Sequence, residues 1–165
     1  MKRLSIIIVT YNSEKDIYDC INSIFQYSDI PADELEIIVV DNGSVGRDVM
    51  FENIRSEYGS DIILIGNSHN GGYGQGNNVG IRRASAPVLL VMNPDVRLAE
   101  PVFSTVLEAF DGDAGLGMYG IKQYLSPTKT SRHSFSMTFM MNGYLWALLT
   151  GLFTRIDIYL PKCMY

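Results

Sequence analysis

Short apolar runs alternate with amphipathic helical patterns through the first two-thirds of the chain, and this alternation constrains the fold more than any other feature. Four runs rich in Ile, Val and Leu are typical of buried strands, at 4–10, 35–40, 61–65 and 88–92. Helical patterns follow them, at 13–25, 49–59, 79–84 and 100–110, with a later strand predicted at 115–124. Strands that alternate with helices form a parallel sheet joined by right-handed crossovers. We therefore predict an α/β fold, with a mainly parallel sheet and helices on both faces.

Composition narrows the classes of function. The chain has 165 residues, of which 47% are hydrophobic, so it can bury the core of an ordinary domain. Its net charge of −5, with no long basic run, argues against nucleic-acid binding through a basic patch. The two cysteines, Cys20 and Cys163, are far apart and form no disulfide or metal framework, which fits a reducing compartment. The first apolar run is too short for a signal peptide, and we expect a cytoplasmic location.

An uncharged segment lies near the carboxyl end. Residues 134–154 contain no Asp, Glu, Lys or Arg, and Arg132 and Arg155 stand just outside them. That length is sufficient to cross a bilayer, yet polar residues interrupt it, and its aromatic residues suit an interface. Three interpretations stay open: a buried or partner-covered helix pair, a helix on the inner surface of the plasma membrane, and a membrane span. Self-association through this segment is a further expectation.

Polar or glycine-rich residues follow each of the four predicted strands. The segments are Thr10-Tyr11-Asn12, Asp41-Asn42-Gly43-Ser44, Gly66 to Asn78, and Asn93-Pro94-Asp95. The carboxyl ends of parallel strands lie at one edge of the sheet, where open α/β sheets bind their ligands. The fully apolar run before Asn93 predicts a strand buried on both faces, which would place Asp95 at the end of a central strand. We therefore predict one crevice lined by all four segments.

Each segment also has an ordinary structural interpretation. Tyr11 either caps the sheet or stacks on a nucleobase. Asp41 either caps the next helix or accepts hydrogen bonds from a base or a ribose. The glycines near Gly72 either form a flexible loop or let the backbone approach a ligand, and Asn77 either caps a helix or reaches that ligand. The Asp95 carboxylate suits a divalent cation bound to phosphates. The glycine spacing matches neither the dinucleotide fingerprint nor a Walker loop.

These four segments together resemble the inverting family 2 glycosyltransferases of the GT-A fold, particularly the bacterial rhamnosyltransferase-like branch. Ser5 to Asn12 resembles the opening strand of the family, and Val39 to Ser44 resembles its second-strand motif. The stretch Asn70 to Gly80 is similar to the loop of that branch, and Asn93-Pro94-Asp95 stands where the wider family has Asp-x-Asp. The resemblance covers residues 4–124 and implies a Rossmann-like nucleotide-diphospho-sugar transferase fold.

The resemblance implies roles for individual residues. Thr10, Tyr11, Asn12 and Asp41 would hold a uracil or thymine base and its ribose, and Gly72 to Asn77 would close over the nucleotide. Asp95 would bind Mg²⁺ or Mn²⁺, which offsets charge on the departing diphosphate. The resemblance thus implies a bacterial enzyme of polysaccharide or cell-wall synthesis that uses a UDP- or dTDP-sugar and a glycan or lipid-linked acceptor. The implied nucleotide-sugar site comprises Thr10, Tyr11, Asn12, Asp41, Asn42, Ser44, Gly72, Tyr73, Gly74, Asn77, Asn93 and Asp95.

Two features depart from the family pattern. Asn93 replaces an acidic residue, which lowers the negative charge available for a metal. The catalytic base of the family lies in a later acidic motif, and nothing after Tyr124 resembles it; Asp157, the only acidic residue beyond Asp113, has a different context. We therefore expect a nucleotide-sugar-binding domain at 1–124 and the start of an acceptor-side region at 125–165, with the catalytic base unassigned.

Two other hypotheses follow from the sequence. The chain could be a catalytically incomplete nucleotide-sugar-binding module, or a subunit of a split enzyme that needs a partner chain. It could also be a nucleotidyltransferase, which would normally carry a glycine-rich loop with basic residues after its first strand. Here the first strand leads into Thr10-Tyr11-Asn12, so this third hypothesis ranks last.

Overall fold

A four-stranded sheet with helices on both faces forms the part of the protein that the computed structural model describes, residues 1–121. Strands and helices alternate along the chain, as the sequence predicts. The strands are β1 (Leu4–Thr10), β2 (Leu35–Asp41), β3 (Ile62–Gly66) and β4 (Val88–Met92). The helices are α1 (Ile17–Tyr27), α2 (Arg47–Tyr58), α3 (Tyr73–Arg83) and α4 (Phe103–Gly112).

The sheet is entirely parallel, and its strand order is β3-β2-β1-β4. Thr10 pairs with Asp41, and Asp41 pairs with Gly66, so β1, β2 and β3 end side by side. The last pair between β1 and β4 joins Ile8 to Met92. The residues after Met92 therefore continue past the level of Ile8 toward the same edge. The predicted α/β class and parallel sheet are confirmed.

The two central strands carry the core, and the two outer strands are less buried. Every residue of β1 and β2 is buried. In β4 only Met92 is buried, and Leu89 is 39% exposed. The prediction of a central strand before Asn93, buried on both faces, was therefore wrong: β4 is an outer strand of the sheet formed by residues 1–121. Composition alone could not reveal this, because strand order depends on contacts between distant segments.

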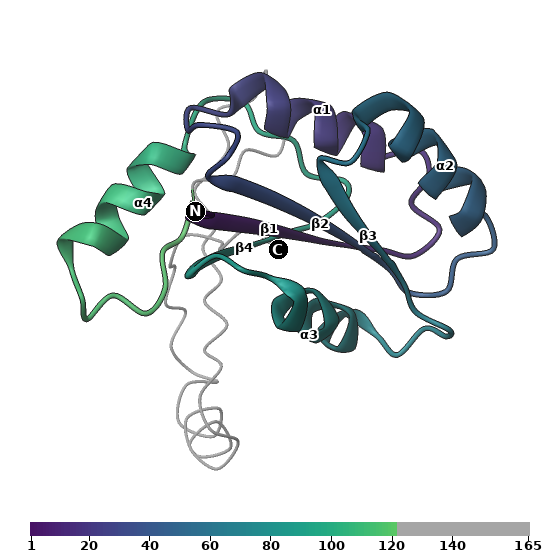
Figure 1. Ribbon diagram of the computed structural model, residues 1–165. Coiled ribbons are helices and arrows are strands. Elements are labelled where there is room, and N and C mark those ends of the chain that lie inside the picture. Colours follow the sequence, from purple (N-terminus) through teal and green to yellow (C-terminus); the bar gives the residue numbers. More distant parts are fainter. Residues whose placement is uncertain (122–165) are drawn as a thin grey trace, which may run out of the picture. The chain divides into compact units, whose positions relative to one another are not determined.

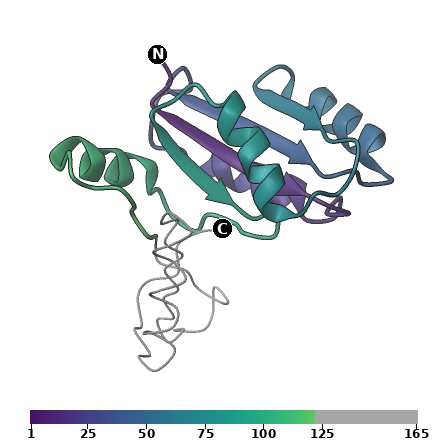
Figure 2. The same cartoon turned by 90° about the horizontal axis from the view of Figure 1, so that it is seen from below.

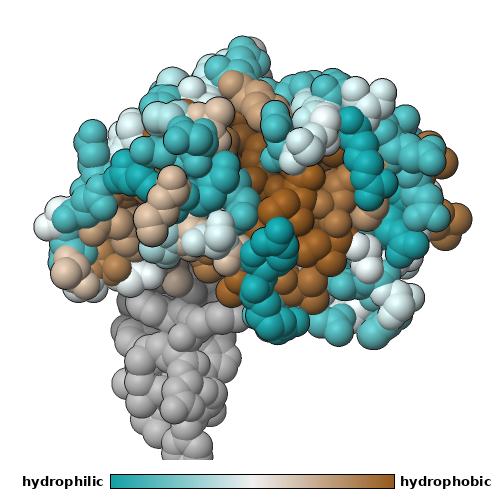
Figure 3. Space-filling view, viewed as in Figure 1, coloured by the Kyte–Doolittle hydropathy of each residue, from teal (hydrophilic) through white to brown (hydrophobic). Residues whose placement is uncertain are grey.

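The helices form a layer on each face of the sheet. Figure 1 shows α1 and α2 on one face and α3 on the other, and Figure 2 shows α3 lying across the strands. In the space-filling view of Figure 3, apolar side chains reach the surface between these layers, and Ile63, Leu64 and Ile65 of the outer strand β3 are only partly buried. The helices thus cover the centre of the sheet more completely than its edges.

Two glycines bring α3 close to the sheet. A Cβ atom at Gly76 would lie 2.6 Å from the Val9 side chain, and a Cβ atom at Gly80 would lie 2.5 Å from the Ile7 side chain. Real Cβ contacts are longer than this, so only glycine permits the observed approach. The helix begins at Tyr73, six residues before the predicted start at Val79, and most of the predicted 72–77 loop is helical. Packing against the sheet explains the difference, because tertiary contacts stabilise sequences with low helix propensity.

Two other helix starts differ from the predicted ones. The helix predicted from Ser13 begins at Ile17, because the Ser13 hydroxyl bonds to the Tyr11 backbone and caps no helix. The helix predicted from Glu100 begins at Phe103. There the Asp29 carboxylate accepts hydrogen bonds from the backbone N–H groups of Phe103 and Ser104, so the helix is capped by a residue distant in sequence.

The chain divides into two compact units, and the first includes Met1–Leu116. The strand predicted at 115–124 is absent from residues 115–121. Within the described part of the chain, no helix is long and apolar enough to cross a membrane. The apolar segment 134–154 lies outside the described residues, as does the predicted acceptor-side region, so the interpretations of that segment and the domain boundary stay predictions.

Candidate functional site

A cavity of about 420 Å³ lies at the carboxyl edge of the sheet, within the size range of small-molecule sites. The ends of β1 and β2, the residues before α3 and the turn after β4 all contribute to it, as the sequence predicts. Its lining residues are Val9, Tyr11, Ser13, Asp16, Asn42, Asn70, Gly72, Tyr73, Asn93, Pro94 and Asp95. The four predicted segments therefore meet at one cavity.

The residues predicted for the site fall into two groups. Six of them line the cavity: Tyr11, Asn42, Gly72, Tyr73, Asn93 and Asp95. Six others do not. Of these, four are buried, namely Thr10, Asp41, Ser44 and Asn77, and two are exposed, namely Asn12 and Gly74. The sequence placed all of these residues at the correct edge of the sheet without separating the two groups.

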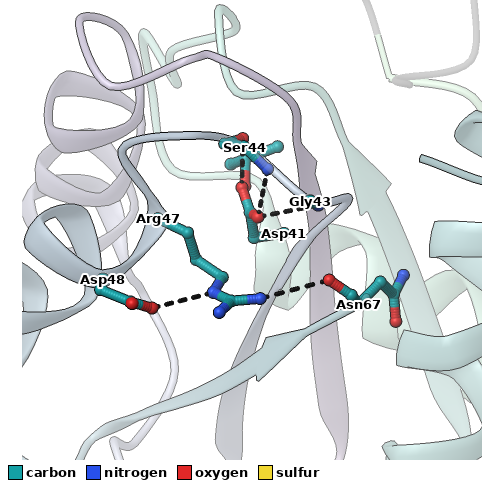
Figure 4. A network of polar contacts seen from close by, with 7 residues as sticks. Asp41, Gly43, Ser44, Arg47, Asp48 and Asn67 are labelled. Atoms are coloured by element: carbon teal, nitrogen blue, oxygen red, sulfur yellow. Dashed lines mark hydrogen bonds and ion pairs between the residues drawn. The ribbon is translucent and has the colours of Figure 1, made fainter. Parts of the chain in front are cut away.

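Asp41 is fully buried, and its carboxylate holds the loops that surround the cavity (Figure 4). Its Oδ1 accepts hydrogen bonds from the backbone N–H groups of Gly43 (2.9 Å) and Ser44 (2.8 Å). Its Oδ2 accepts hydrogen bonds from the hydroxyls of Thr10 and Ser44. The backbone N–H of Asn12, a residue with φ of +52°, donates to the Ser44 hydroxyl. Asp41 thus ties the end of β1 to the turn after β2.

Asn42 follows Asp41 and is 2% exposed, although it reaches the cavity wall. Its Nδ2 donates to the Gly72 carbonyl at 3.0 Å, and its Oδ1 accepts a hydrogen bond from Asn67 Nδ2 at 2.7 Å. Both ends of the amide are therefore used within the chain. Asn42 connects the end of β2 to the end of β3 and to the start of α3.

The turn after β4 rests on one face of α1. The Cys20 thiol lies 3.6 Å from the Asn93 carbonyl, and burial raises the pKa of this thiol to about 12. The thiol therefore remains protonated at neutral pH and can donate to that carbonyl. One turn later along α1, the Ser23 hydroxyl accepts a hydrogen bond from the backbone N–H of Leu98. These contacts fix the backbone that carries Asn93 and Asp95.

The lining of the cavity is acidic and polar. It includes the carboxylates of Asp16 and Asp95, and among residues 1–121 no Lys or Arg lines it. The sequence pattern did not predict Ser13 and Asp16 as lining residues, because it assigned both to the start of a helix. Their position shortly after the end of β1 could have indicated that they reach the cavity. Asn70 and Pro94 lie in two of the four predicted segments, whereas the sequence did not identify Val9 as a wall residue.

Asn77 lies in α3, one turn after Tyr73 and on the same side of the helix. It is 8% exposed, and its Oδ1 has no hydrogen-bond partner among the described residues. An unpaired buried acceptor is costly, so such atoms usually have a ligand, an ion or a water as partner.

Comparison with protein families gives a match over most of the chain. The family model described as glycosyl transferase family 2 matches residues 5–157. A teichoic acid poly(glycerol phosphate) polymerase of Staphylococcus epidermidis is 29% identical over 118 residues, which are 70% of this chain and 16% of that protein. Poly(ribitol-phosphate) β-N-acetylglucosaminyltransferase TarS of Staphylococcus aureus is 31% identical over 96 residues, 58% of this chain and 16% of TarS. The chain therefore matches only a small part of the length of these relatives.

Solved structures share the fold. The crystal structure of S. aureus TarS 1–349 in complex with UDP has a TM-score of 0.59 and 26% sequence identity, covering 73% of this chain and 38% of that one. A mannosyltransferase from Pyrobaculum calidifontis, solved with GDP-Man and Mn²⁺, has a TM-score of 0.63 and 22% identity, covering 73% of this chain and 36% of that one. The second likeness concerns the fold alone.

Proposed function

Because the chain belongs to glycosyl transferase family 2, with the α/β arrangement of the GT-A fold, we propose that its cavity binds a nucleoside-diphosphate sugar. The protein then transfers the sugar, with inversion, to a glycan or lipid-linked acceptor. The observation that carries this proposal is the convergence of Tyr11, Tyr73, Asn93 and Asp95 on one cavity at the carboxyl edge of the sheet. Ligands of open α/β sheets bind at this edge.

A uridine diphosphate sugar is the preferred donor in this proposal. TarS, with 26% identity over 73% of this chain, is solved in complex with UDP, and a further TarS structure contains UDP-GlcNAc. Two relatives that match by sequence carry names from teichoic acid synthesis, which supports a role in bacterial cell-wall polymers. The segment Asn70 to Gly80 favours the rhamnosyltransferase-like branch, and thymidine diphosphate donors remain part of the proposal.

Exposure separates the roles of the site residues. Tyr11 is 50% exposed and Tyr73 is 39% exposed, so both rings are accessible for stacking on a flat base. Asn93 offers an amide to ribose hydroxyls. Thr10, Asp41 and Ser44 are buried and hydrogen-bonded to one another, so they orient the loops that present the accessible residues. In this proposal the buried group sets the shape of the site, and the accessible group contacts the donor.

The oxygen atoms at the cavity suit a divalent cation that binds together with the diphosphate. Asp95 and Asp16 supply carboxylate oxygens and Asn93 an amide oxygen, which are the ligand types that Mg²⁺ and Mn²⁺ prefer. Within residues 1–121, no cluster of three or more His, Cys, Asp and Glu residues could hold a metal ion, so phosphates and waters would complete the coordination. When bound, the cation stabilises negative charge on the departing diphosphate. Asp95 would hold it, with Asn93 beside it.

The negative charge of the cavity supports the proposal that the diphosphate binds together with a cation. A diphosphate carries at least two negative charges, and the described part of the chain lines the cavity with two carboxylates and with no Lys or Arg. Like charges at short distance repel, so a bare diphosphate would bind poorly there. We therefore expect UDP to bind weakly in EDTA and more tightly with Mn²⁺.

Titration calorimetry with UDP tests the proposal. The wild-type chain should bind UDP in Mn²⁺, and Asp95→Ala should weaken that binding at least about tenfold, as losses around metal sites commonly do. Asp33→Ala is the matched control, because Asp33 is an exposed carboxylate outside the cavity. Absence of UDP affinity in the wild type with Mn²⁺ present would overturn the proposed function. Equal affinity in the wild type and Asp95→Ala would overturn only the role of Asp95.

A further inference from the structure

The start of α3 has little stability of its own. Its N-cap residue is Gly72, which provides no side-chain hydrogen bond, and its first four residues include Gly74 and Gly76. Glycine within a helix costs about 1 kcal/mol relative to alanine, and glycine in place of a capping side chain costs about a few tenths of a kcal/mol more. Yet Tyr73, the first helical residue, lines the cavity. Something outside the helix must hold this end in place.

The Gly72 carbonyl is the point at which the rest of the protein holds α3. It accepts the first helical hydrogen bond, from the backbone N–H of Gly76 at 3.1 Å. It also accepts the hydrogen bond from Asn42 Nδ2 at 3.0 Å. A Cβ atom at Gly76 would lie 3.0 Å from Asn42 Nδ2, so the amide packs directly against the first turn of the helix. Asn42 therefore anchors α3 to the end of β2.

Asn67 fixes the orientation of the Asn42 amide, and Arg47 holds the backbone of Asn67. Asn67, directly after β3, donates from Nδ2 to Asn42 Oδ1 at 2.7 Å. This bond leaves Asn42 Nδ2 directed at Gly72. Arg47, at the start of α2, donates from Nη1 to the backbone carbonyl of Asn67 at 3.2 Å, while its Nε pairs with Asp48 (Figure 4). Neither Asn67 nor Arg47 lines the cavity.

We propose that Asn67 and Arg47 are positioning residues of the donor site. Through Asn42 they hold the Gly72 carbonyl, and thereby place the first turn of α3 and Tyr73 at the wall of the cavity. We call Arg47, Asn67, Asn42 and Gly72 the amide relay. The relay connects the ends of β2 and β3 to the first turn of α3, which has low intrinsic helix stability. Its effect on ligand binding rests on the proposed function, whereas its effect on α3 does not.

Hydrogen–deuterium exchange and calorimetry on the 165-residue chain test the relay together. Asn67→Ala should speed amide exchange in peptides covering 72–78 without nucleotide, while exchange in α1 stays unchanged. It should also weaken binding of UDP with Mn²⁺ about tenfold, the loss expected if only about a tenth of the free variant keeps the first turn of α3 in the binding position. Asn53→Ala is the matched control, because the Asn53 amide bonds to Tyr18 on the exposed outer surface. It should change neither measurement.

A second pair of variants keeps the inference testable if Asn67→Ala folds poorly. Arg47→Ala should also speed exchange at 72–78, whereas Arg55→Ala, an exposed arginine of the same helix, should not. In a double-mutant cycle, adding Asn67→Ala to Asn42→Ala should cause little further change, because both act through one bond to Gly72. Unchanged exchange at 72–78 in both Asn67→Ala and Arg47→Ala would overturn the relay. If the wild-type chain has no affinity for UDP, the proposed donor site is refuted. The exchange rates at 72–78 then decide by themselves whether the relay holds α3.

Discussion

At the scale of single residues, Asn77 has a buried oxygen whose desolvation lowers the stability of the fold. Its Oδ1 is buried without a hydrogen-bond partner among residues 1–121, in a helix that packs on the sheet beside the cavity. Removing such an atom from a protein is often neutral or stabilising, because the desolvation penalty disappears. Alanine is also the better helix former by several tenths of a kcal/mol. If a donor group of the nucleotide satisfies this oxygen, the penalty is offset only in the complex.

Asn77→Ala should therefore separate stability from binding. We expect the free energy of unfolding without ligand to rise by about 1 kcal/mol, measured by urea denaturation, while the affinity for UDP with Mn²⁺ falls. Asn78→Ala is the control, because Asn78 is exposed on the same helix, and its affinity should match the wild type. A large loss of stability in Asn77→Ala would instead indicate that the Asn77 side chain supports the fold.

At the scale of elements, the packing of α3 on the central strands depends on small residues. A Cβ atom at Gly80 would lie 2.5 Å from the Ile7 side chain and 3.3 Å from that of Val40. Both are β-branched residues inside a fully buried part of the sheet, so they have little freedom to move. We expect Gly80→Ala to lower the free energy of unfolding by about 1–3 kcal/mol, the usual cost of overpacking a core.

Gly74 provides the comparison within the same helix. A Cβ atom there would meet nothing within 4 Å among the described residues, so Gly74→Ala should keep the stability gain of up to about 1 kcal/mol from better helix propensity. Thermal or urea denaturation of the two variants measures the difference. Equal stabilisation by both substitutions would show that α3 can move away from the sheet, contrary to the close approach described above.

At the scale of the whole molecule, a buried carboxylate at the amino edge of the sheet, opposite the cavity, makes stability depend on pH. Glu36 is 7% exposed and accepts hydrogen bonds from the Ser5 hydroxyl and from the backbone N–H and hydroxyl of Ser85. Burial by itself would raise the pKa of Glu36, but these hydrogen bonds and the nearby Arg83 together hold it below its ordinary value of 4.5. The ionised carboxylate thus joins β1, β2 and the connection between α3 and β4.

The lowered pKa gives the sign of the pH effect. The folded state holds the proton of Glu36 less tightly than the unfolded chain, so Glu36 stabilises the fold above pH 4.5, and this contribution is lost as pH falls through the lowered pKa. We expect Glu36→Gln to cost about 2 kcal/mol at pH 7, in the range of hydrogen bonds to charged groups, and progressively less below pH 4.5. Urea denaturation across pH measures it. Glu34→Gln, which alters a partly exposed ion pair with Arg3, should change stability by less than about 1 kcal/mol.

Much of the fold was predictable because its signals are local. Each of the four strands begins or ends within one residue of the predicted bounds, since runs such as Leu4–Thr10 are apolar throughout and stop at polar or glycine residues. Helix starts were less predictable where the stabilising partner is distant in sequence. Asp29 caps α4, and the sheet supports the glycine-rich start of α3. Neither contact can be recognised from the residues next to the helix start.

The sequence by itself determined that this protein has a parallel α/β sheet, and that polar segments collect at its carboxyl edge, because residue type sets strand ends and parallel pairing aligns them. Only the tertiary structure decided which residues touch the cavity. It buried Asp41 with four hydrogen bonds to its carboxylate and directed the Asn42 amide at Gly72. It also made β4 an outer strand of the sheet formed by residues 1–121 and brought Asp16 to the cavity wall. Burial and hydrogen-bond partners arise from contacts between distant segments, and a linear pattern does not contain them.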